Sequence, residues 1–164
     1  MTERGTISAM DKKILVIIFI LVALALITLW VRGAFSAPTL SGVKVRIGGY
    51  EYAVDVADTI PAKAQGLSGR AGLASGEGML FVFDSPQMQT FWMHGMLFPI
   101  DIIWILDDTV VGVTENAPIP TSQFETPTFS SPSPINRVFE VAAGTALKNG
   151  IVVGSKVEIL GYGK

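Results

Sequence analysis

The chain has 164 residues, a formal net charge of −2 at pH 7 and no cysteine. This length is enough for one domain with its own core, and the lack of cysteine excludes a disulfide framework and a thiolate nucleophile. Residues 33–164 contain eight Lys and Arg and twelve Asp and Glu, so this part of the chain has no basic surface for binding nucleic acid.

Residues 14–31 form a run of eighteen residues without a charge. A bilayer core about 30 Å thick needs about 20 apolar residues in a helix, which satisfies its own backbone in lipid. Lys12 and Lys13 precede the run and Arg32 alone follows it, so the positive-inside rule keeps residues 1–13 in the cytoplasm. We therefore expect a single-pass signal anchor in the cell membrane, with the lipid bilayer as a partner and the remainder periplasmic or extracellular.

A cleaved signal peptide is the alternative to an anchor. The triplet Ala34-Phe35-Ser36 loosely fits a small-x-small cleavage site. The apolar regions of signal peptides are usually ~7–15 residues long, and this run is longer, which favours an uncleaved anchor. Residues 32–42 combine small residues with Pro and Gly and indicate a linker to an exported domain at residues 43–162.

The exported segment begins with a predicted hairpin and a short helix. Residues 43–47 and 50–56 alternate in polarity on either side of Gly48-Gly49, a two-residue turn typical of hairpins. Asp58 or Thr59 can cap a helix that Gly66 ends.

Further strand-like segments follow the helix. They lie at residues 79–83, 90–94, 99–106, 110–114, 137–141 and 156–160, with a helical turn at 145–148. Residues 117–136 hold five of the nine prolines and predict a long irregular loop, a kind of loop that is usually functional or disordered. The pattern predicts a mainly β (β-rich α+β) domain: one compact antiparallel sheet, curled towards a small barrel, with short helices at its edges.

Six short motifs occur in order along this domain. They are GLSGR (66–70), GMLFVF (78–83), FWM (91–93), PIDIIWI (99–105), FEVAAG (139–144) and GSKVEI (154–159). Together they resemble the domain of unknown function 192 (DUF192) family of bacteria and archaea, over about residues 43–160. The resemblance implies a compact mainly β domain, often exported behind a signal or anchor, and no established activity.

The family pattern matches some positions of this chain and not others. Matching positions are Gly66, Leu67, Arg70, Gly78, Met79, Trp92, Met93, Pro99, Asp101, Glu140 and Gly144. The chain departs from the family at residues 94–96, where a basic residue, Asn and Thr are usual, and at Ile100 and Ser155, where Leu and an acidic residue are usual. A polar role shared by the whole family at residues 94–96 is therefore not supported by this chain.

Asp101 lies in an apolar segment and shares a strand face with Ile103 and Ile105, so the pattern buries it. A buried carboxylate without a partner costs several kcal/mol, so a partner is expected. Arg70 is the preferred partner, because a guanidinium can bind a carboxylate bidentately. Asp101 therefore has two possible roles. It is either structural, in an ion pair or in a clasp of hydrogen bonds from a backbone turn, or functional, as a polar group at the floor of a binding cleft.

Glu140 shares a strand face with Val138 and is the second candidate acid. Two carboxylates whose pKa values are split by their surroundings can hydrolyse glycosides. An envelope hydrolase that acts on polysaccharide or peptidoglycan through Asp101 and Glu140 is therefore the alternative function. Retaining glycosidases hold the two groups about 5–5.5 Å apart and inverting ones about 6.5–9.5 Å, so buried carboxylates that face apart would exclude it.

The stretch from Trp92 to Met96 holds the remaining candidates. Trp92, near the proline-rich loop, is an aromatic residue of the kind that lines sugar or peptide grooves, or else it covers the open end of the core. Strand alternation puts Met93 and His94 on opposite faces and places His94 with Met96, a pair of soft ligands for Cu(I). His94 has no Gly-x-Ser-x-Gly nucleophile for which it could act as a general base. Methionine is an ordinary core residue, so we expect no metal and no cofactor.

These observations favour a membrane-anchored, extracytoplasmic binding or accessory domain of the cell envelope, without chemistry of its own. The expected ligand is a glycan, peptide or protein of the envelope. The expected binding residues are Arg70, Trp92, Met93, His94, Asp101 and Glu140.

Overall fold

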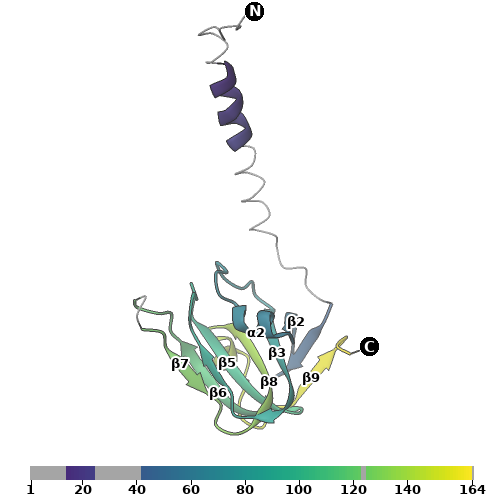
Figure 1. The fold of residues 1–164 in the computed structure, drawn as a ribbon. Helices are drawn as coiled ribbons and strands as arrows, with labels where there is room; N and C mark the ends of the chain where they lie inside the picture. The colour runs from purple at the N-terminus through teal and green to yellow at the C-terminus, as the bar shows by residue number, and fades with distance from the viewer. Residues whose placement is uncertain (1–13, 25–41, 123–124, 164) are drawn as a thin grey trace, which may run out of the picture. The chain divides into compact units, whose positions relative to one another are not determined.

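The computed structural model describes residues 14–24, 42–122 and 125–163, and the chain divides into two units, Met1–Pro38 and Thr39–Lys164. In the first unit, residues 14–24 form a helix (Figure 1). Its side chains are almost all exposed. Within the described ranges no helix has the length and apolar character to cross a membrane. Residues 25–31, the second part of the predicted anchor, lie outside those ranges.

The second unit is built mainly from strands. Seven of them, in chain order, are β1 (Lys44–Ile47), β2 (Tyr50–Ala57), β3 (Glu77–Gln87), β5 (Ile100–Leu106), β6 (Thr109–Ala117), β8 (Ile135–Ala142) and β9 (Val157–Leu160). They form one sheet in the order β6-β5-β8-β3-β2-β1-β9. A separate two-stranded sheet pairs β4 (Thr90–Trp92) with β7 (Thr128–Ser130). Two short helices, α2 (Ile60–Gln65) and α3 (Thr145–Lys148), complete the unit.

The first hairpin follows the sequence prediction. β1 and β2 pair antiparallel, with Ile47 opposite Tyr50 at the turn. Gly48 and Gly49 both have positive φ, at 59° and 80°, which is the backbone that a two-residue type I′ turn requires. The predicted hairpin is confirmed.

The pairing of β2 with β3 corrects the prediction of a wholly antiparallel sheet. Five of the six neighbouring pairs in the described sheet are antiparallel, but β2 and β3 run parallel, from Ala53 opposite Glu77 to Ala57 opposite Phe81. The segment between them, residues 58–76, contains α2 and is long enough to return the chain to the starting end of β2. The small β4-β7 sheet is a second departure from the predicted single sheet.

The sheet curls (Figure 1), and one isolated bridge brings its two edge strands together at one end. Thr109, at the start of β6, forms a bridge with Lys156 just before β9. Around it, Val157 N donates to Asp108 O at 2.8 Å and Val110 N donates to Ser155 O at 3.0 Å. The result is a half-barrel, which confirms the predicted curled, mainly β domain with short helices.

Both faces of the sheet are buried. Neighbouring residues of β8 belong to different apolar clusters, since Phe139 and Val141 pack in one and Val138 in the other. The second cluster, which also contains Phe81, is covered by residues of α2 and β4, including Ala62 and Phe91. Burial on both sides explains the nearly continuous apolar run of β5.

Candidate functional site

Asp101 is fully buried and is held by the backbone. Its Oδ1 accepts a hydrogen bond from Asn116 N at 2.9 Å, and its Oδ2 accepts one from Ala146 N at 2.8 Å. The carboxylate therefore ties β6 to the first turn of α3 across β5. Of the arrangements considered from the sequence, the clasp of backbone hydrogen bonds is confirmed.

Arg70 is not the partner of Asp101. Its Nη2 binds Asp55 Oδ2 at 2.7 Å in a partly buried ion pair, so the predicted Arg70–Asp101 pair is wrong. The physical reason is the face of the sheet. Asp55 lies opposite Met79 and faces the cluster under α2, whereas Asp101 lies opposite Val141 and faces the other cluster.

Glu140 is the second buried carboxyl group, with 5% of its surface exposed. It lies in one row across the sheet with Asp55, Met79 and Ile102. Among the residues that the structure describes, none donates a hydrogen bond to it or pairs with it. Burial raises the pKa of Glu140 to about 8, because the ionised form loses its hydration and gains no partner.

The structure does not bring the two candidate acids together. Asp101 shares its face with Val141, while Glu140 shares its face with Ile102, so the two carboxyl groups point to opposite sides of the sheet. Both oxygens of Asp101 already accept backbone hydrogen bonds. The geometry that a glycosidase requires is therefore not present at this pair.

A surface hollow, here called the aromatic groove, is lined by residues of α2, β3 and β4. Its volume is about 300 Å³. It is lined by Lys63, Ala64, Phe81, Phe83, Gln89, Thr90, Phe91 and Trp92. The rings of Phe81 and Phe91 meet edge to face with centroids 4.8 Å apart, and Trp92 is 57% exposed at the rim. This is the concave, mostly apolar lining that small-molecule sites use.

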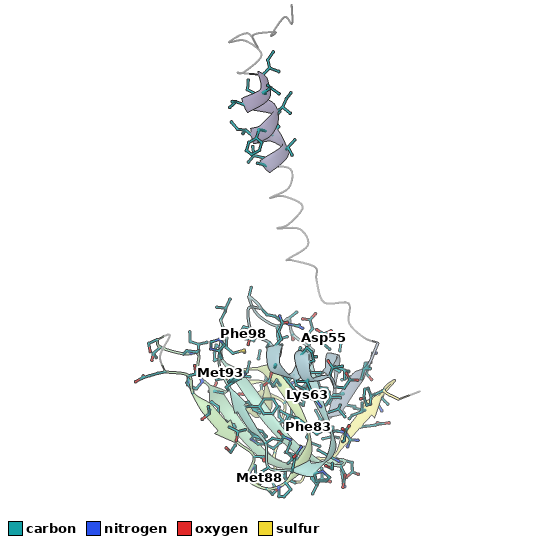
Figure 2. All side chains as sticks on the ribbon, in the orientation of Figure 1. Asp55, Lys63, Phe83, Met88, Met93 and Phe98 are labelled. Carbon is teal, nitrogen blue, oxygen red and sulfur yellow. The ribbon has the colours of Figure 1, made fainter. Side chains whose placement is uncertain are left out.

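One cation stands in this groove. The Nζ of Lys63 lies 4.7 Å from the centre of the Phe83 ring, and the two residues lie side by side in Figure 2. The ring face attracts the ammonium group through its quadrupole.

A small inner pocket adjoins the aromatic groove and shares Lys63, Phe81 and Trp92 with it. Its volume is about 20 Å³, which is room for one group the size of a water molecule. Glu140 forms part of its wall. Glu140, whose carboxyl group has no partner among the described residues, therefore lines a hollow that adjoins the groove.

Residues 65–68, at the end of α2 and in the loop after it, form one wall of the inner pocket, and the local sequence explains their conformation. Thr59 caps α2, since its Oγ1 accepts a hydrogen bond from Ala62 N, and α2 ends at Gly66 with φ +51°. A side chain at Gly66 would meet the Phe81 ring at 3.2 Å, so the loop can lie directly on β3 only with glycine there. Ser68 Oγ then donates to His94 O at 2.6 Å, which ties this loop to the turn after β4.

The turn after β4 changes the expected placement of Met93 to Met96. β4 ends at Trp92, and Met96 N donates to Met93 O, so strand alternation does not apply beyond Trp92. Met93 and Met96 are buried, and His94 is exposed with its ring centroid 5.8 Å from that of Trp92. His94 is therefore a rim residue, as predicted, and shares no common strand face with Met96.

Metal ligands of the usual kinds do not gather in the described parts of the chain. No group of three or more His, Asp or Glu in the described residues could hold an ion. His94 and Met96 both line a further hollow beside Pro120 and Thr121.

Sequence reasoning named Trp92 but missed the other residues that line the groove. Lys63, Phe83 and Phe91 come from α2, β3 and β4, and each alone is an ordinary helix or strand residue. The available signal was the density of aromatic residues in GMLFVF and FWM, which exceeds what one strand face can bury. Only the tertiary fold shows that these rings surround one hollow.

Comparison with known proteins gives a family and two solved structures. The model of the DUF192 family, described as Uncharacterized ACR, COG1430, matches residues 43–159. A crystal structure of a protein of unknown function from Novosphingobium aromaticivorans DSM 12444 is 31% identical, covers 73% of this chain and 89% of that chain, and has a TM-score of 0.66.

A second crystal structure is similar to this chain to about the same extent. It is a candidate transcription regulator from Sinorhizobium meliloti 1021, with 30% identity, coverage of 71% of this chain and 92% of that chain, and a TM-score of 0.65. No curated protein matches the chain. The family match confirms the resemblance that the six motifs indicated.

Proposed function

The chain belongs to the DUF192 family, whose activity is not established, and we propose that it is a membrane-anchored, extracytoplasmic binding domain without chemistry of its own. The observation that carries this proposal is the aromatic groove, an apolar hollow of about 300 Å³ with the half-exposed Trp92 at its rim. Such hollows, with few polar groups and exposed aromatic rings, bind ligands through burial and stacking.

The chemistry of the buried acids supports binding over catalysis. A general acid–base pair needs two groups within reach of one reacting bond. Asp101 uses both oxygens in backbone hydrogen bonds, and Glu140 lies on the other side of the sheet. One carboxyl group is left for the groove, and it can act as a recognition group.

The location outside the cytoplasm is proposed from the N-terminal sequence. Residues 14–31 carry no charge, Lys12 and Lys13 precede them, and a helix with exposed apolar side chains is described over residues 14–24. A helix of this composition gains by entering lipid. The domain would then meet its ligand in the cell envelope.

Binding in the groove is tested with the full chain in detergent. Thermal unfolding is followed against a panel of envelope glycans, peptides and apolar small molecules, because a ligand of the folded state raises the Tm by mass action. We expect at least one ligand to raise the Tm of the wild type and of Val153→Ala, a surface control that is 65% exposed, but not of Trp92→Ala. A panel without such a Trp92-dependent ligand would refute the groove as a binding site.

The topology is tested separately in cells. Protease added to intact spheroplasts should digest the domain at residues 42–163 and leave a cytoplasmic marker protein intact. Full protection of that domain would contradict the proposed orientation.

A further inference from the structure

We propose that the aromatic groove binds an organic primary amine, whose ammonium group enters the inner pocket and pairs with Glu140 while its apolar body lies against Phe91 and Trp92. This inference rests on the proposed binding function and names the ligand class of the same site. It follows from four features of the described residues: an unpartnered carboxyl group, a lysine over an aromatic ring, the size of the inner pocket and the register of the sheet.

The carboxyl group of Glu140 needs a partner that the described residues do not supply. Burying a carboxylate is unfavourable unless a cation or several hydrogen-bond donors compensate for its lost hydration. Two cations on this side of the sheet have other contacts, since Arg70 pairs with Asp55 and Lys63 stands over Phe83. The pocket lined by Glu140 shares Lys63, Phe81 and Trp92 with the groove, so the two hollows adjoin, and a ligand held in the groove lies next to this pocket.

Lys63 indicates the kind of partner. Its ammonium group lies in the groove at 4.7 Å from the Phe83 ring centre, so the rings of this hollow already stabilise one alkylammonium ion. Aromatic rings beside a carboxylate are the usual surroundings of a bound organic ammonium group. Lys63 also lines the inner pocket, and as a like charge it competes with a cationic ligand there.

The volumes of the two hollows set the shape of the ligand. The inner pocket, about 20 Å³, admits one group the size of a water molecule, which fits –NH₃⁺ and excludes a trimethylammonium group. The groove, about 300 Å³, is large enough for a phenyl-sized body. The ligand class is therefore a primary amine with a short apolar or aromatic body.

Binding of an amine is coupled to proton release. Burial raises the pKa of Glu140 to about 8, so at neutral pH the group is mainly protonated, and it loses that proton to solvent when an ammonium ion pairs with it. An alkylammonium ion itself stays charged below about pH 10. The affinity for the amine should therefore rise about tenfold per pH unit up to pH 8 and level off above it.

Other titratable or charged groups lie around the pocket on several elements. Among the described residues, Lys63 on α2 lines the pocket, and Asp55 on β2 lies in the same row as Glu140 and pairs with Arg70. The row neighbours of Glu140 on β3 and β5 are the apolar Met79 and Ile102. His94 is exposed beside Trp92 and lines a different hollow. A His94→Gln background removes this imidazole from the measurement.

The experiment is calorimetric titration of the full chain in detergent, in the His94→Gln background, with 2-phenylethylamine as the probe between pH 6 and pH 9. We expect affinity to rise about tenfold per unit below pH 8, where about one proton is released per amine bound, and the number of released protons to fall towards zero above pH 8, as measured in buffers of different ionisation enthalpy. Glu140→Gln should lower the affinity at pH 8.5 at least tenfold and remove the pH dependence. Lys63→Gln should raise the affinity severalfold, and Val153→Ala should leave it unchanged.

Two neutral or bulky analogues separate this inference from the proposed function. We expect 2-phenylethanol and N,N,N-trimethyl-2-phenylethylammonium to bind at least tenfold more weakly than the amine at pH 8.5. If 2-phenylethanol binds as well as the amine, or Glu140→Gln binds the amine like the wild type, the amine inference is overturned while a binding groove remains. If the amine does not bind, the inference is overturned, and the Trp92-dependent panel then decides the proposed function on its own.

Discussion

Two buried carboxyl groups, one on β5 and one on β8, are only one register position apart and have opposite surroundings. Asp101 accepts hydrogen bonds from two backbone N–H groups, at 2.9 and 2.8 Å. Glu140 has no partner among the described residues, and its pKa rises to about 8. Burial alone therefore does not distinguish a structural acid from a functional one. The two are distinguished by the hydrogen-bond donors within reach of the carboxyl oxygens.

The comparison also separates stability from function. A clasped carboxylate stabilises the fold, since its removal leaves buried donors unsatisfied. An unpartnered buried acid destabilises the fold, and such groups persist where a ligand supplies the missing partner. The following experiments, ordered by the size of the expected effect, test whether Asp101 and Glu140 differ in this way.

Asp101→Ala should have the largest effect. It leaves the part-buried N–H group of Asn116 and the buried N–H group of Ala146 without their acceptor, at about 1–3 kcal/mol each, so we expect a loss of about 4 kcal/mol. That is a large share of the ~5–15 kcal/mol of a typical domain. Denaturant unfolding of the full chain in detergent measures it, with the exposed Asp108→Ala as control. A loss below about 1 kcal/mol would mean that the clasp is not structural.

Glu140→Gln should stabilise the protein, whereas Asp101→Ala should destabilise it. The pKa of Glu140 rises from 4.5 to about 8 on folding, so between these values the folded state holds a proton that the unfolded state releases, and stability falls as pH rises. Glutamine has no such proton. At pH 7 the variant should gain about 3 kcal/mol, since one pKa unit is about 1.4 kcal/mol, and the gain should vanish near pH 4.5. Unfolding midpoints across this range measure it, and a pH-independent difference would contradict the assignment.

The Arg70–Asp55 ion pair should show a smaller coupling. Both side chains are partly exposed, at 25% and 14%, so solvent screens the pair and a double-mutant cycle should give about 1 kcal/mol. The matching cycle between Arg70 and Asp101 should give a coupling near zero, because the two residues lie on opposite faces of the sheet. A clear Arg70–Asp101 coupling would mean that the two faces are energetically linked.

Trp92→Ala should have the smallest effect on stability. The side chain is 57% exposed at the groove rim, so we expect a change within about 0.5 kcal/mol in the free energy of unfolding. The same variant should lose the binding of groove ligands. A large destabilisation would instead make Trp92 a cover for the core.

Local signals in the sequence predicted most of the elements. The hairpin at Gly48-Gly49, the Thr59-capped helix and the strand at residues 100–106 each depend on residues close together in the chain. The parallel pairing of β2 with β3 could not be predicted, because polarity alternates in the same way in either strand direction. The short strand β7 lies in the proline-rich loop, where propensity argued against it.

The candidate site was harder to predict than the fold. Burial of Asp101 followed from its own strand, but its donors, Asn116 and Ala146, are backbone groups from other elements and leave no mark in the side-chain pattern. To predict the partner of Arg70, one would have to know which face of the sheet the loop after α2 covers. The same tertiary information decides that Glu140 meets the groove.

The position of β8 sets the order in which this domain can assemble. β8 is the last but one of the described strands and lies inside the sheet, between β3 and β5, while β9 pairs with β1. A chain emerging from the ribosome or a translocation channel therefore lacks the strand that joins β5 and β6 to the rest of the sheet until about residue 142 is free. Such non-local pairing folds slowly and as one cooperative unit, so a nascent or truncated chain would stay extended and sensitive to proteases until its final residues are released.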